Sequence, residues 1–426
     1  MDAKDVRKLR EEALAGHDGR AAEIDKWSKD HGGAHHRVNR YASKVNPQAL
    51  NALCDYIQGV LERVVLPDSL ALLEILNYLR HYNFTETDEA GRDSSEFSLA
   101  VSEIEVALGH FQRDTAAALR YLVYRHSVKK NNRNYQVRAF PTFLYVEAAL
   151  ACNLMCTMCY QSDPKMQAMI KDSEKTMMDW DLYTKIIDEA ASHGLCGIIF
   201  AGRGEPTLNR RFTDMIKYAW DKGILDIKFN TNVMKLTEKM VCDWLSMNAP
   251  LTVVFSVDAA DKEGFEAIRL GASFEKVVAN IEMFNRIRKE EFPDTPVRTR
   301  VSMTLFQDNQ DPEAARKLWG SLVDEFTAKN ARGEQSGSIY QNDLSGSPKN
   351  ISPDVKCRVL FDRLYVWCDG KVNPCEDDYM SKLVVGNAYQ SSLKDLWQGP
   401  AMMKMRLAHL NGKKNSCYPC NGCNGY

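Results

Sequence analysis

The chain has little net charge and no long apolar run. Its 426 residues include 55 Lys and Arg and 57 Asp and Glu, a formal charge of −2, so nothing in the charge balance favours nucleic acid or an anionic membrane as a partner. No segment approaches the roughly 18 apolar residues of a membrane span, and the charged start "MDAKDVRKLREEALAGHDGR" lacks the apolar core of a signal peptide. We therefore expect a soluble, cytoplasmic protein with no nucleic-acid or membrane partner.

Disulfide bonds are not expected among the twelve cysteines either, because the cytoplasm keeps thiols reduced. Clustered cysteines in such a protein more often bind metal or act in catalysis. Cys54, Cys196 and Cys242 stand alone, and we expect each to be a small buried side chain. The others form three groups: Cys152, Cys156 and Cys159; Cys357, Cys368 and Cys375; and Cys417, Cys420 and Cys423.

The pattern of apolar residues divides the chain into three predicted domains. Residues 1–135 have helical spacing, as in "SLALLEILNYLRHY", and we expect a helical domain that packs against the next one or covers its mouth. Residues 136–345 alternate short β-rich runs with amphipathic helices such as "DWDLYTKIIDEAASHG" and "SFEKVVANIEMFNRIRKEE". Residues 346–426 hold six clustered cysteines around a predicted hairpin at Asp369-Gly370, which suggests a small unit held together by metal.

Six strands are predicted in the middle domain, which suits a partial (β/α)6 barrel, with a doubly wound sheet as the alternative. Their sequences are "FLYVEAAL", "CGIIFAG", "DIKFNTN", "LTVVFSVD", "VRTRVSMTLF" and "SGSIYQNDL".

Cys152, Cys156 and Cys159 directly follow the first predicted strand, in "ACNLMCTMCY". In parallel α/β folds the functional groups gather where the strands end, so these thiols should lie at the active face. Three thiolates in one loop can hold an iron–sulfur cluster, whereas structural zinc requires a fourth ligand. The nearest following candidates, His193 and Cys196, are more than thirty residues away. An open coordination position leaves room for a substrate or cofactor.

This spacing after the first strand of a predicted partial barrel resembles the radical S-adenosylmethionine (SAM) superfamily. The resemblance implies that Cys152, Cys156 and Cys159 bind three irons of a [4Fe–4S] cluster, and that SAM chelates the fourth iron. It also implies reductive cleavage of SAM to a 5′-deoxyadenosyl radical that abstracts hydrogen, with a reducing partner such as flavodoxin or ferredoxin.

Other strand ends carry residues for which the resemblance implies contacts to SAM. "GRGEP" is similar to the family's glycine-glycine-glutamate-proline motif, although an ordinary turn is the alternative. In the family an aromatic residue often precedes the third cysteine, but here that position is Met158, which leaves the adenine contact in doubt. The residues expected to bind SAM are Met158, Tyr160, Gly202, Gly204, Glu205, Asn230, Asn232, Ser256, Asp258 and Arg269.

The C-terminal cysteines resemble the SPASM/twitch extension of many radical SAM enzymes, together with "VGNAYQSSLKDLW". The resemblance implies one auxiliary [4Fe–4S] cluster bound by Cys357, Cys375, Cys417 and Cys420, and hence two clusters in the protein. Cys423 is an alternative ligand, and zinc an alternative metal. Cys368, in the apolar run "YVWC", is expected to be buried.

The substrate is expected to be a small polar molecule, a sugar or aminocyclitol that is oxidised, epimerised or subjected to elimination. "NPCEDDYMSKLVVGN" is similar to the tails of carbohydrate-modifying members, and Asp377 and Asp378 could bind substrate hydroxyls or amines or could be surface charges. The alternatives are a maturase of a ribosomally made peptide, an iron–sulfur electron carrier and a zinc-stabilised binding protein. An all-helical N-terminal region argues against the strand-containing module with which many peptide maturases recruit their substrate.

Overall fold

The N-terminal part is mainly helical in the computed structural model, which describes residues 36–37, 45–63, 68–82, 97–130, 133–305, 310–330 and 356–423. Its helices are α3 (Pro47–Arg63), α4 (Ser69–Arg80), α5 (Val101–Arg113) and α6 (Thr115–Lys130). A two-residue strand, β1 (His36–Arg37), pairs antiparallel with β7 (Glu325–Asn330) at the sheet edge. The region predicted to be all-helical therefore also contributes one short strand.

The middle of the chain alternates strands and helices, and several helices start at a side-chain cap. Asp179 accepts a hydrogen bond from the Leu182 N–H at the start of α8. The elements are β2 (Phe143–Val146), η1 (Tyr160–Ser162), α7 (Pro164–Lys171), α8 (Trp180–Ser192), β3 (Gly197–Phe200), η2 (Pro206–Leu208), α9 (Phe212–Asp221), β4 (Asp226–Thr231), α10 (Glu238–Ser246), β5 (Leu251–Ser256), α11 (Lys262–Ile268), α12 (Phe274–Glu290), β6 (Arg298–Leu305), α13 (Pro312–Trp319) and β7.

Strands β2 to β7 lie side by side in chain order, and all run parallel. A doubly wound sheet would reverse this order at a switch point, so the predicted partial barrel is confirmed. The sixth strand is β7, which the sequence pattern does not reveal, and the predicted segment 336–344 lies outside the described residues. "EFTAKN" is short and mostly polar: Phe326 and Ala328 pack in the core, while Glu325 lines the cavity between the barrel and the N-terminal helices.

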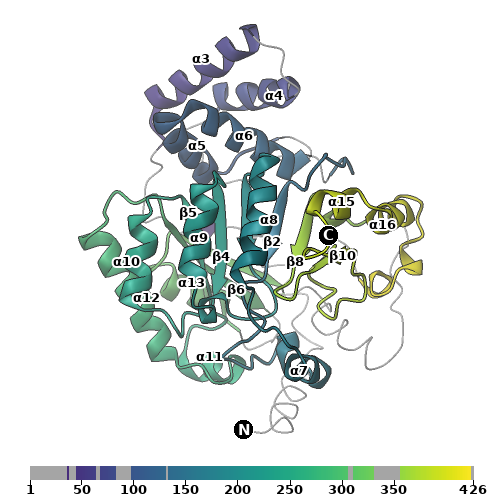
Figure 1. The fold of residues 1–426 in the computed structure, drawn as a ribbon. Helices are drawn as coiled ribbons and strands as arrows, with labels where there is room; N and C mark the ends of the chain where they lie inside the picture. The colour runs from purple at the N-terminus through teal and green to yellow at the C-terminus, as the bar shows by residue number, and fades with distance from the viewer. Residues whose placement is uncertain are drawn as a thin grey trace.

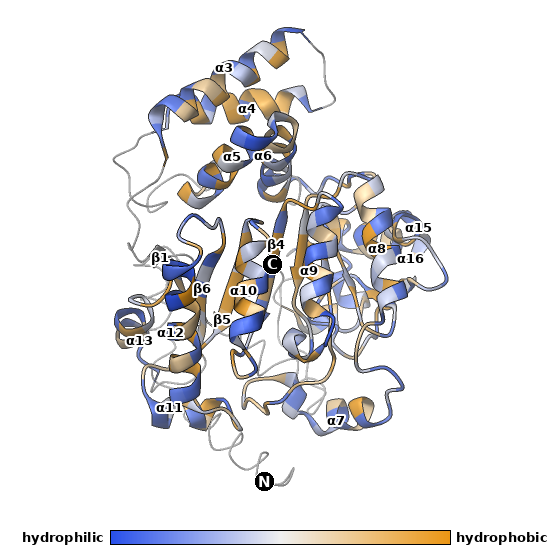
Figure 2. Cartoon of the chain, turned by 60° about the vertical axis from the view of Figure 1, so that its left-hand side comes forward, coloured by the Kyte–Doolittle hydropathy of each residue, from blue (hydrophilic) through white to orange (hydrophobic). Residues whose placement is uncertain are grey.

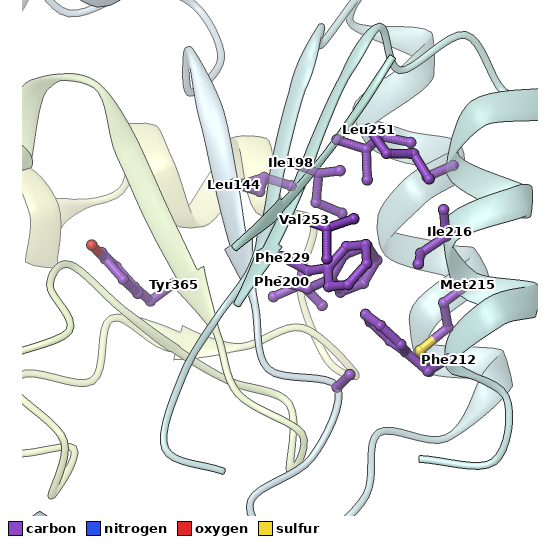
Figure 3. Close-up of a cluster of buried hydrophobic side chains, with 14 of the residues drawn as sticks. Leu144, Ile198, Phe200, Phe212, Met215, Ile216, Phe229, Leu251, Val253 and Tyr365 are labelled. Carbon is purple, nitrogen blue, oxygen red and sulfur yellow. The ribbon is translucent and has the colours of Figure 1, made fainter. Parts of the chain in front are cut away.

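The main core lies between the strands and the helices that cover their outer face. Figure 3 shows Phe200 and Phe229, on adjacent strands, facing Phe212 and Met215 of α9. All four side chains are at most 1 % exposed. Polar residues lie mainly on the outer faces of the covering helices, which is the amphipathic pattern expected of such a layer (Figure 2).

Helices α5 and α6 pack against the end of the barrel at which the strands begin (Figure 1). Tyr124 covers Gly197, the first residue of β3, where a Cβ atom would lie 2.3 Å from the tyrosine hydroxyl oxygen. The same hydroxyl donates to Asp226, the first residue of β4, over 3.0 Å, and Arg125 Nη1 donates to Asp226 over 3.1 Å. The N-terminal helices therefore contact the barrel at the end opposite the predicted active face.

A polar cavity of about 410 Å³ lies between these helices and the barrel interior. Hydroxyl-bearing and charged side chains dominate its polar lining: Tyr78, Tyr82, Tyr121, Tyr124, Arg125, Lys129, Lys228, Arg298, Arg300, Glu103, Asp226 and Glu325.

The C-terminal segment forms a small unit that joins the same sheet. Its elements are η3 (Val359–Phe361), β8 (Arg363–Val366), β9 (Lys371–Asn373), β10 (Gly386–Asn387), α15 (Leu393–Gln398), α16 (Pro400–Leu410), η4 (Lys414–Ser416) and η5 (Cys420–Gly422). β8 and β9 form the predicted hairpin, with Gly370 at φ +83° in its turn. β8 also pairs parallel with β2, so the small unit extends the barrel sheet.

Among the described residues, no helix combines the length and apolar character needed to cross a membrane.

A buried carboxylate is predicted to stabilise the docking of α5 and α6. Burial alone would raise the pKa of Glu103, but Arg125 and Lys129 lower it to about 2, below the ordinary 4.5. Because the folded pKa is the lower one, this stabilisation is present above pH 4.5 and is lost as the pH falls through the folded value. Glu103→Gln should lower the opening free energy of α5 and α6 at neutral pH by about 3 kcal/mol.

Hydrogen exchange of these two helices measures the loss, which should shrink as the pH is lowered below 4.5. Glu275→Gln is the matched control, because the ion pair between Glu275 and Lys262 is exposed. Equal effects of the two variants would contradict a special role for Glu103.

Candidate functional site

The first cysteine group lies in a loop that follows β2 at the carboxyl end of the barrel. The backbone N–H of Met155 donates to the Leu270 carbonyl over 3.0 Å, and that of Thr157 donates to the Ile268 carbonyl over 2.9 Å. The Cys159 N–H donates to the Cys156 carbonyl over 3.0 Å. The loop is therefore held against the segment that follows α11, next to Arg269.

The three thiols are close enough to influence one another's ionisation. Burial raises the pKa of Cys156 to about 11, with a further contribution from Cys152. Burial and then the charge of Cys156 raise the pKa of Cys159, and burial also raises that of Cys152. Three thiols in one loop, one buried and two partly buried, are a donor set that fits an iron–sulfur cluster, because bound iron would stabilise the thiolate forms.

Arg269 brings a positive charge to this group. Its Nη2 lies 2.6 Å from Asp258 Oδ2 in an ion pair, and its Nη1 lies 3.9 Å from Cys156 Sγ. Burial alone would lower the pKa of Arg269, but Asp258 and Cys156 raise it, so the side chain stays charged. Its Nε is buried and has no hydrogen-bond partner among the described residues.

Asp258, predicted to contact SAM, is fully buried and used within the fold. Besides the ion pair with Arg269, its Oδ1 accepts a hydrogen bond from the Thr304 N–H over 2.8 Å. These contacts tie the end of β5 to β6 and orient the guanidinium. Ser256, at the end of the same strand, is partly exposed.

The "GRGEP" turn packs directly on the chain that leads into the cysteine loop. A Cβ atom on Gly204 would lie 2.4–2.5 Å from the carbonyl oxygens of residues 149–151, so only glycine fits there. The Glu205 N–H donates to the Ala151 carbonyl over 2.9 Å. The turn and the cysteine loop therefore form one packed unit.

The Glu205 carboxylate links this turn to the end of β4. It accepts hydrogen bonds from the Thr231 hydroxyl over 2.8 Å and from the Asn232 N–H over 2.7 Å. The Asn232 amide in turn donates to Asn153 Oδ1 over 3.0 Å and lies 3.9 Å from Cys152 Sγ. Asn230, on the same strand, has a buried Oδ1 with no hydrogen-bond partner in the part of the chain described.

The two predicted contacts inside the cysteine motif differ in their surroundings. Met158 is partly buried against the core. The Tyr160 hydroxyl donates to the Gly202 carbonyl over 2.7 Å, and its ring stacks on Tyr379 with centroids 4.9 Å apart. Tyr160 therefore connects the turn to the C-terminal unit.

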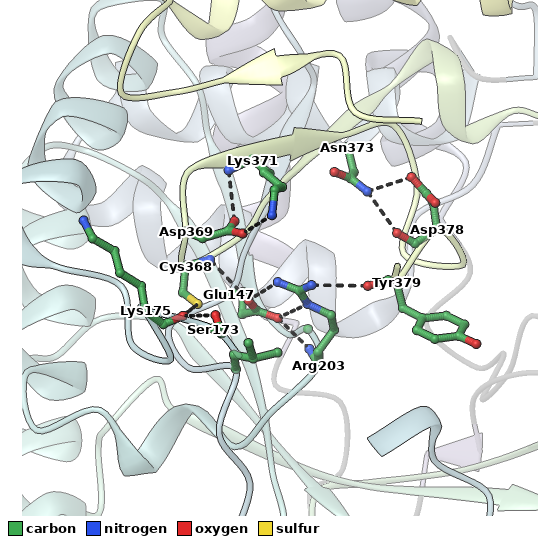
Figure 4. Close-up of polar contacts among 12 residues, drawn as sticks. Glu147, Ser173, Lys175, Arg203, Cys368, Asp369, Lys371, Asn373, Asp378 and Tyr379 are labelled. Carbon is green, nitrogen blue, oxygen red and sulfur yellow. Dashed lines mark hydrogen bonds and ion pairs between the residues drawn. The ribbon is translucent and has the colours of Figure 1, made fainter. Parts of the chain in front are cut away.

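A buried ion pair between Glu147 and Arg203 lies where the barrel meets the C-terminal unit, and no sequence pattern pointed to it (Figure 4). Arg203 Nε and Nη2 each lie 2.8 Å from a different carboxylate oxygen of Glu147, and both side chains are at most 2 % exposed. Glu147 also accepts from the Cys368 N–H over 3.2 Å, and Arg203 donates to the Tyr379 carbonyl over 3.2 Å. Arg203 also lies over the Trp367 ring, at 4.4 Å. The pair thus connects the "GRGEP" turn to the end of β8.

The cysteines of the C-terminal unit lie close enough to influence one another's ionisation, and one of them contacts α16. The Cys357 N–H donates to His409 Nδ1 on α16 over 3.3 Å. Burial raises the pKa of Cys357 to about 11, with Cys423 as the next cause. Burial, then Cys357 and then Cys423 raise the pKa of Cys420. Cys375 is also close, because its pKa is raised by burial and, among other groups, by Cys357 and Cys423.

Cys423 therefore lies with Cys357, Cys375 and Cys420, while Cys417 adjoins Cys420. Asp377 connects two of them: its N–H donates to Cys375 Sγ over 3.3 Å, and its Oδ2 lies 4.0 Å from Cys423 Sγ. Cys368 is fully buried and donates to the Lys175 carbonyl over 3.4 Å, away from this group. Nowhere in the described ranges do three His, Cys, Asp or Glu side chains converge on a single metal ion.

Asp378, a predicted substrate contact, is 2 % exposed and accepts hydrogen bonds from its own loop. The donors are the N–H groups of Lys382 and Leu383, over 2.6 and 2.7 Å, and the Asn373 amide over 2.8 Å. Burial raises the pKa of Asp378 to about 6. These contacts support a structural role in shaping the loop after Cys375.

Comparison with known families agrees with this arrangement. A family model for the radical SAM superfamily matches residues 146–317, and one for the SPASM iron–sulfur cluster-binding domain matches residues 357–424. The chain belongs to the radical SAM superfamily and is an enzyme of that class with a C-terminal SPASM domain. Its radical SAM domain binds SAM and a [4Fe–4S] cluster, and its SPASM domain binds auxiliary iron–sulfur clusters.

Among individual proteins, the chain is 26 % identical over 321 residues to the "tungsten-containing aldehyde ferredoxin oxidoreductase cofactor-modifying protein" of Pyrococcus furiosus. This match covers 66 % of the chain and 87 % of the relative. Solved structures with a similar fold include BtrN in complex with AdoMet and 2-DOIA, at 18 % identity and a TM-score of 0.41, covering 68 % of this chain and 93 % of BtrN. Streptococcus suis SuiB bound to S-adenosylmethionine has 15 % identity and a TM-score of 0.49, covering 78 % of this chain and 89 % of SuiB.

Removing one partner of the Glu147–Arg203 pair should loosen the C-terminal unit. Arg203→Met leaves Glu147 buried without its counter-charge, at a cost of about 3–5 kcal/mol, whereas adding Glu147→Gln should recover part of the loss. Hydrogen exchange of the β8–β9 hairpin measures the effect on the C-terminal unit, and calorimetric titration with SAM measures the effect on the "GRGEP" turn. Arg211→Met is the control, because Arg211 is half exposed. Unchanged exchange in the hairpin of Arg203→Met would show that the pair does not connect the two parts.

The surroundings of Cys423 predict that it is an auxiliary-cluster ligand and that Cys417 is not. After anaerobic reconstitution, Cys423→Ser should lose about four irons per chain and the corresponding reduced-cluster signal in electron paramagnetic resonance. Cys417→Ser should retain both, and it serves as the matched control in the same loop. The reverse result would restore the ligand set Cys357, Cys375, Cys417 and Cys420.

Proposed function

We propose that the enzyme cleaves SAM at the site formed by Cys152, Cys156, Cys159 and the strand-end residues, and abstracts hydrogen from a carbon of a small polar substrate. We favour a sugar or aminocyclitol as substrate. The main support for a SAM site here is the guanidinium of Arg269, which lies beside Cys156. The buried Nε of Arg269 has no hydrogen-bond partner among the described residues. A buried, unpaired donor is costly unless a ligand accepts its hydrogen bond.

In this proposal the chain orients SAM through groups already held in place. Arg269 Nε donates to the SAM carboxylate, while Asp258 keeps the guanidinium in position. The buried Asn230 Oδ1 accepts from a donor on the ligand. Glu205 holds Asn232 and the turn carrying Gly202 and Gly204. When bound, the cluster and SAM supply a 5′-deoxyadenosyl radical, and the barrel positions the carbon and excludes water.

The cavity between the N-terminal helices and the barrel interior supports a small polar substrate. Its volume of about 410 Å³ falls within the usual range for small-molecule sites, about 300–1,000 Å³. Lys228 lines the cavity and lies two residues before Asn230 on β4, so both side chains project from the same face, roughly 7 Å apart along the strand. The tyrosine hydroxyls and charged groups of the lining suit a molecule with several hydroxyl or amino groups.

A second candidate function is modification of a cofactor that belongs to another enzyme. It is favoured by the name of the Pyrococcus furiosus relative, 87 % of whose length this chain matches. A peptide maturase remains the alternative in which the substrate is ribosomally made. Residues 45–63, 68–82 and 97–130, as far as the structure describes this region, contain helices and no strand that could form part of a strand-containing leader-binding module.

We also propose the division into domains 1–135, 136–345 and 346–426, with the N-terminal domain covering the end of the barrel at which the strands begin.

The C-terminal domain then holds one auxiliary [4Fe–4S] cluster, which can accept an electron from a substrate radical and so favour net oxidation. Free thiols at both cysteine sites are best maintained in the cytoplasm.

Transfer of deuterium tests the proposed chemistry directly. Reconstituted enzyme should hold about eight irons per chain and, after reduction, release 5′-deoxyadenosine from SAM. With a substrate deuterated at the reacting carbon, the released 5′-deoxyadenosine should carry the label, as detected by mass spectrometry. Aminocyclitols, sugars, a cofactor extract and a peptide are compared as substrates.

Arg269→Lys keeps the charge but loses the planar fork, so it should weaken SAM binding at least tenfold with unchanged iron content. Arg286→Lys, on the exposed surface of α12, is the control. Four irons and no cleavage of SAM would refute the enzyme function, and label from the peptide alone would identify a maturase.

A further inference from the structure

The outer face of α16 carries an exposed apolar stripe. Met403, Leu407 and Leu410 are 46 %, 49 % and 37 % exposed, and their spacing places them on one side of the helix. We call these three residues the α16 stripe. The opposite side of the helix is buried through Met402, Met405, Arg406 and His409.

The inner side of α16 contacts the auxiliary cysteine group. His409 Nδ1 accepts the hydrogen bond of the Cys357 N–H over 3.3 Å. An α-helix with its side chains is roughly 10–12 Å across, so α16 is the single layer between Cys357 and the α16 stripe. Tyr418, between Cys417 and Cys420, is also 46 % exposed. Cys357 itself is buried, but Cys417, Cys420 and Cys423 are partly exposed, so the final loop brings this cysteine group to the surface.

The charged residues of the segment that carries the stripe have one sign, although Arg406 and Lys414 are buried. Residues 400–423 contain Lys404, Arg406, Lys413 and Lys414 and no Asp or Glu, although the whole chain is nearly neutral. Lys404 is exposed and lies next to Met403 of the stripe, and Lys413 is exposed just beyond the end of the helix. Figure 1 shows α16 at the outer edge of the C-terminal unit, where a partner can approach. A small apolar centre with a cationic rim is complementary to an acidic protein surface.

We propose that the α16 stripe, with Lys404 and Lys413, is the docking face for a small acidic one-electron carrier protein of the flavodoxin or ferredoxin kind. This inference rests on the C-terminal unit holding an auxiliary cluster, and goes beyond the proposed reaction by naming where reducing equivalents enter. One electron passes from the reduced carrier across α16 to the auxiliary centre, so the carrier is oxidised by one electron and the centre reduced by one. No bond or proton changes hands.

The size of the stripe favours this occupant over a second copy of the chain. Three partly exposed aliphatic side chains cover far less than the roughly 2,000 Å² or more buried in stable homodimers. Transient electron-transfer complexes have the smallest protein interfaces and rely on charge for their association rate.

The test measures binding of an acidic flavodoxin to reconstituted enzyme by calorimetry, and electron transfer by stopped flow. Met403→Glu with Leu407→Glu, and separately Lys404→Glu with Lys413→Glu, should each weaken binding at least tenfold and slow reduction by flavodoxin to a similar extent. Binding to the unchanged enzyme should weaken as salt is raised. Reduction by dithionite, which needs no docking face, should stay unchanged in every variant.

Leu70→Glu with Leu73→Glu is the matched control, because these two leucines on α4 are 79 % and 50 % exposed and lie in the N-terminal region. It should bind flavodoxin normally. The lysine pair keeps the proposal testable if the glutamates in the stripe disturb folding. Normal binding by the lysine variant, absence of flavodoxin binding by the unchanged enzyme, or a dimer that dissociates on substitution of the stripe would each overturn the proposal. Failure of SAM cleavage with intact docking would instead count against the proposed reaction.

Discussion

The ion pair between Glu147 and Arg203 is the contact on which the arrangement of the site depends. Glu147 directly follows β2, and Arg203 lies between the two glycines of the "GRGEP" turn. The same pair holds the C-terminal unit through the Cys368 N–H and the Tyr379 carbonyl. Both side chains are almost fully buried, so removing either one would leave the other as an unpaired buried charge, which is strongly destabilising. The "GRGEP" turn and the SPASM domain are therefore held in one mutual position.

Strand β2 joins the same two parts of the structure through backbone hydrogen bonds. It pairs with β3 on one side and with β8 on the other, both parallel. A strand from the C-terminal unit thus continues the barrel sheet, and the first cysteine loop emerges between two buried neighbours. This explains how the two cysteine groups belong to one continuous sheet framework: the first group follows β2, and the C-terminal group lies in the unit that contributes β8.

Much of the site could be predicted from the sequence, because its chemistry depends on residues that are close along the chain. The spacing of Cys152, Cys156 and Cys159, the "GRGEP" turn and the Asp369-Gly370 hairpin each specify a local structure through a few neighbouring residues. Several long-range contacts could not be predicted. Asp258 and Arg269 were expected to contact SAM separately, yet they form an ion pair with each other. Asp378 is enclosed by its own loop, and Cys423 lies with three other cysteines of the tail.

The sequence was sufficient for the class of enzyme, the parallel barrel and the two cysteine sites, because hydrophobic periodicity and metal-ligand spacing are properties of short segments. The folded chain was needed to show that the N-terminal helices cover the start of the strands, that β7 lies at Glu325–Asn330, and that α16 separates the auxiliary cysteines from an exposed apolar stripe. These features depend on which surfaces meet after folding. The residues that form a short polar strand, a buried salt bridge or the outer face of a helix resemble those of many segments that form none of these structures.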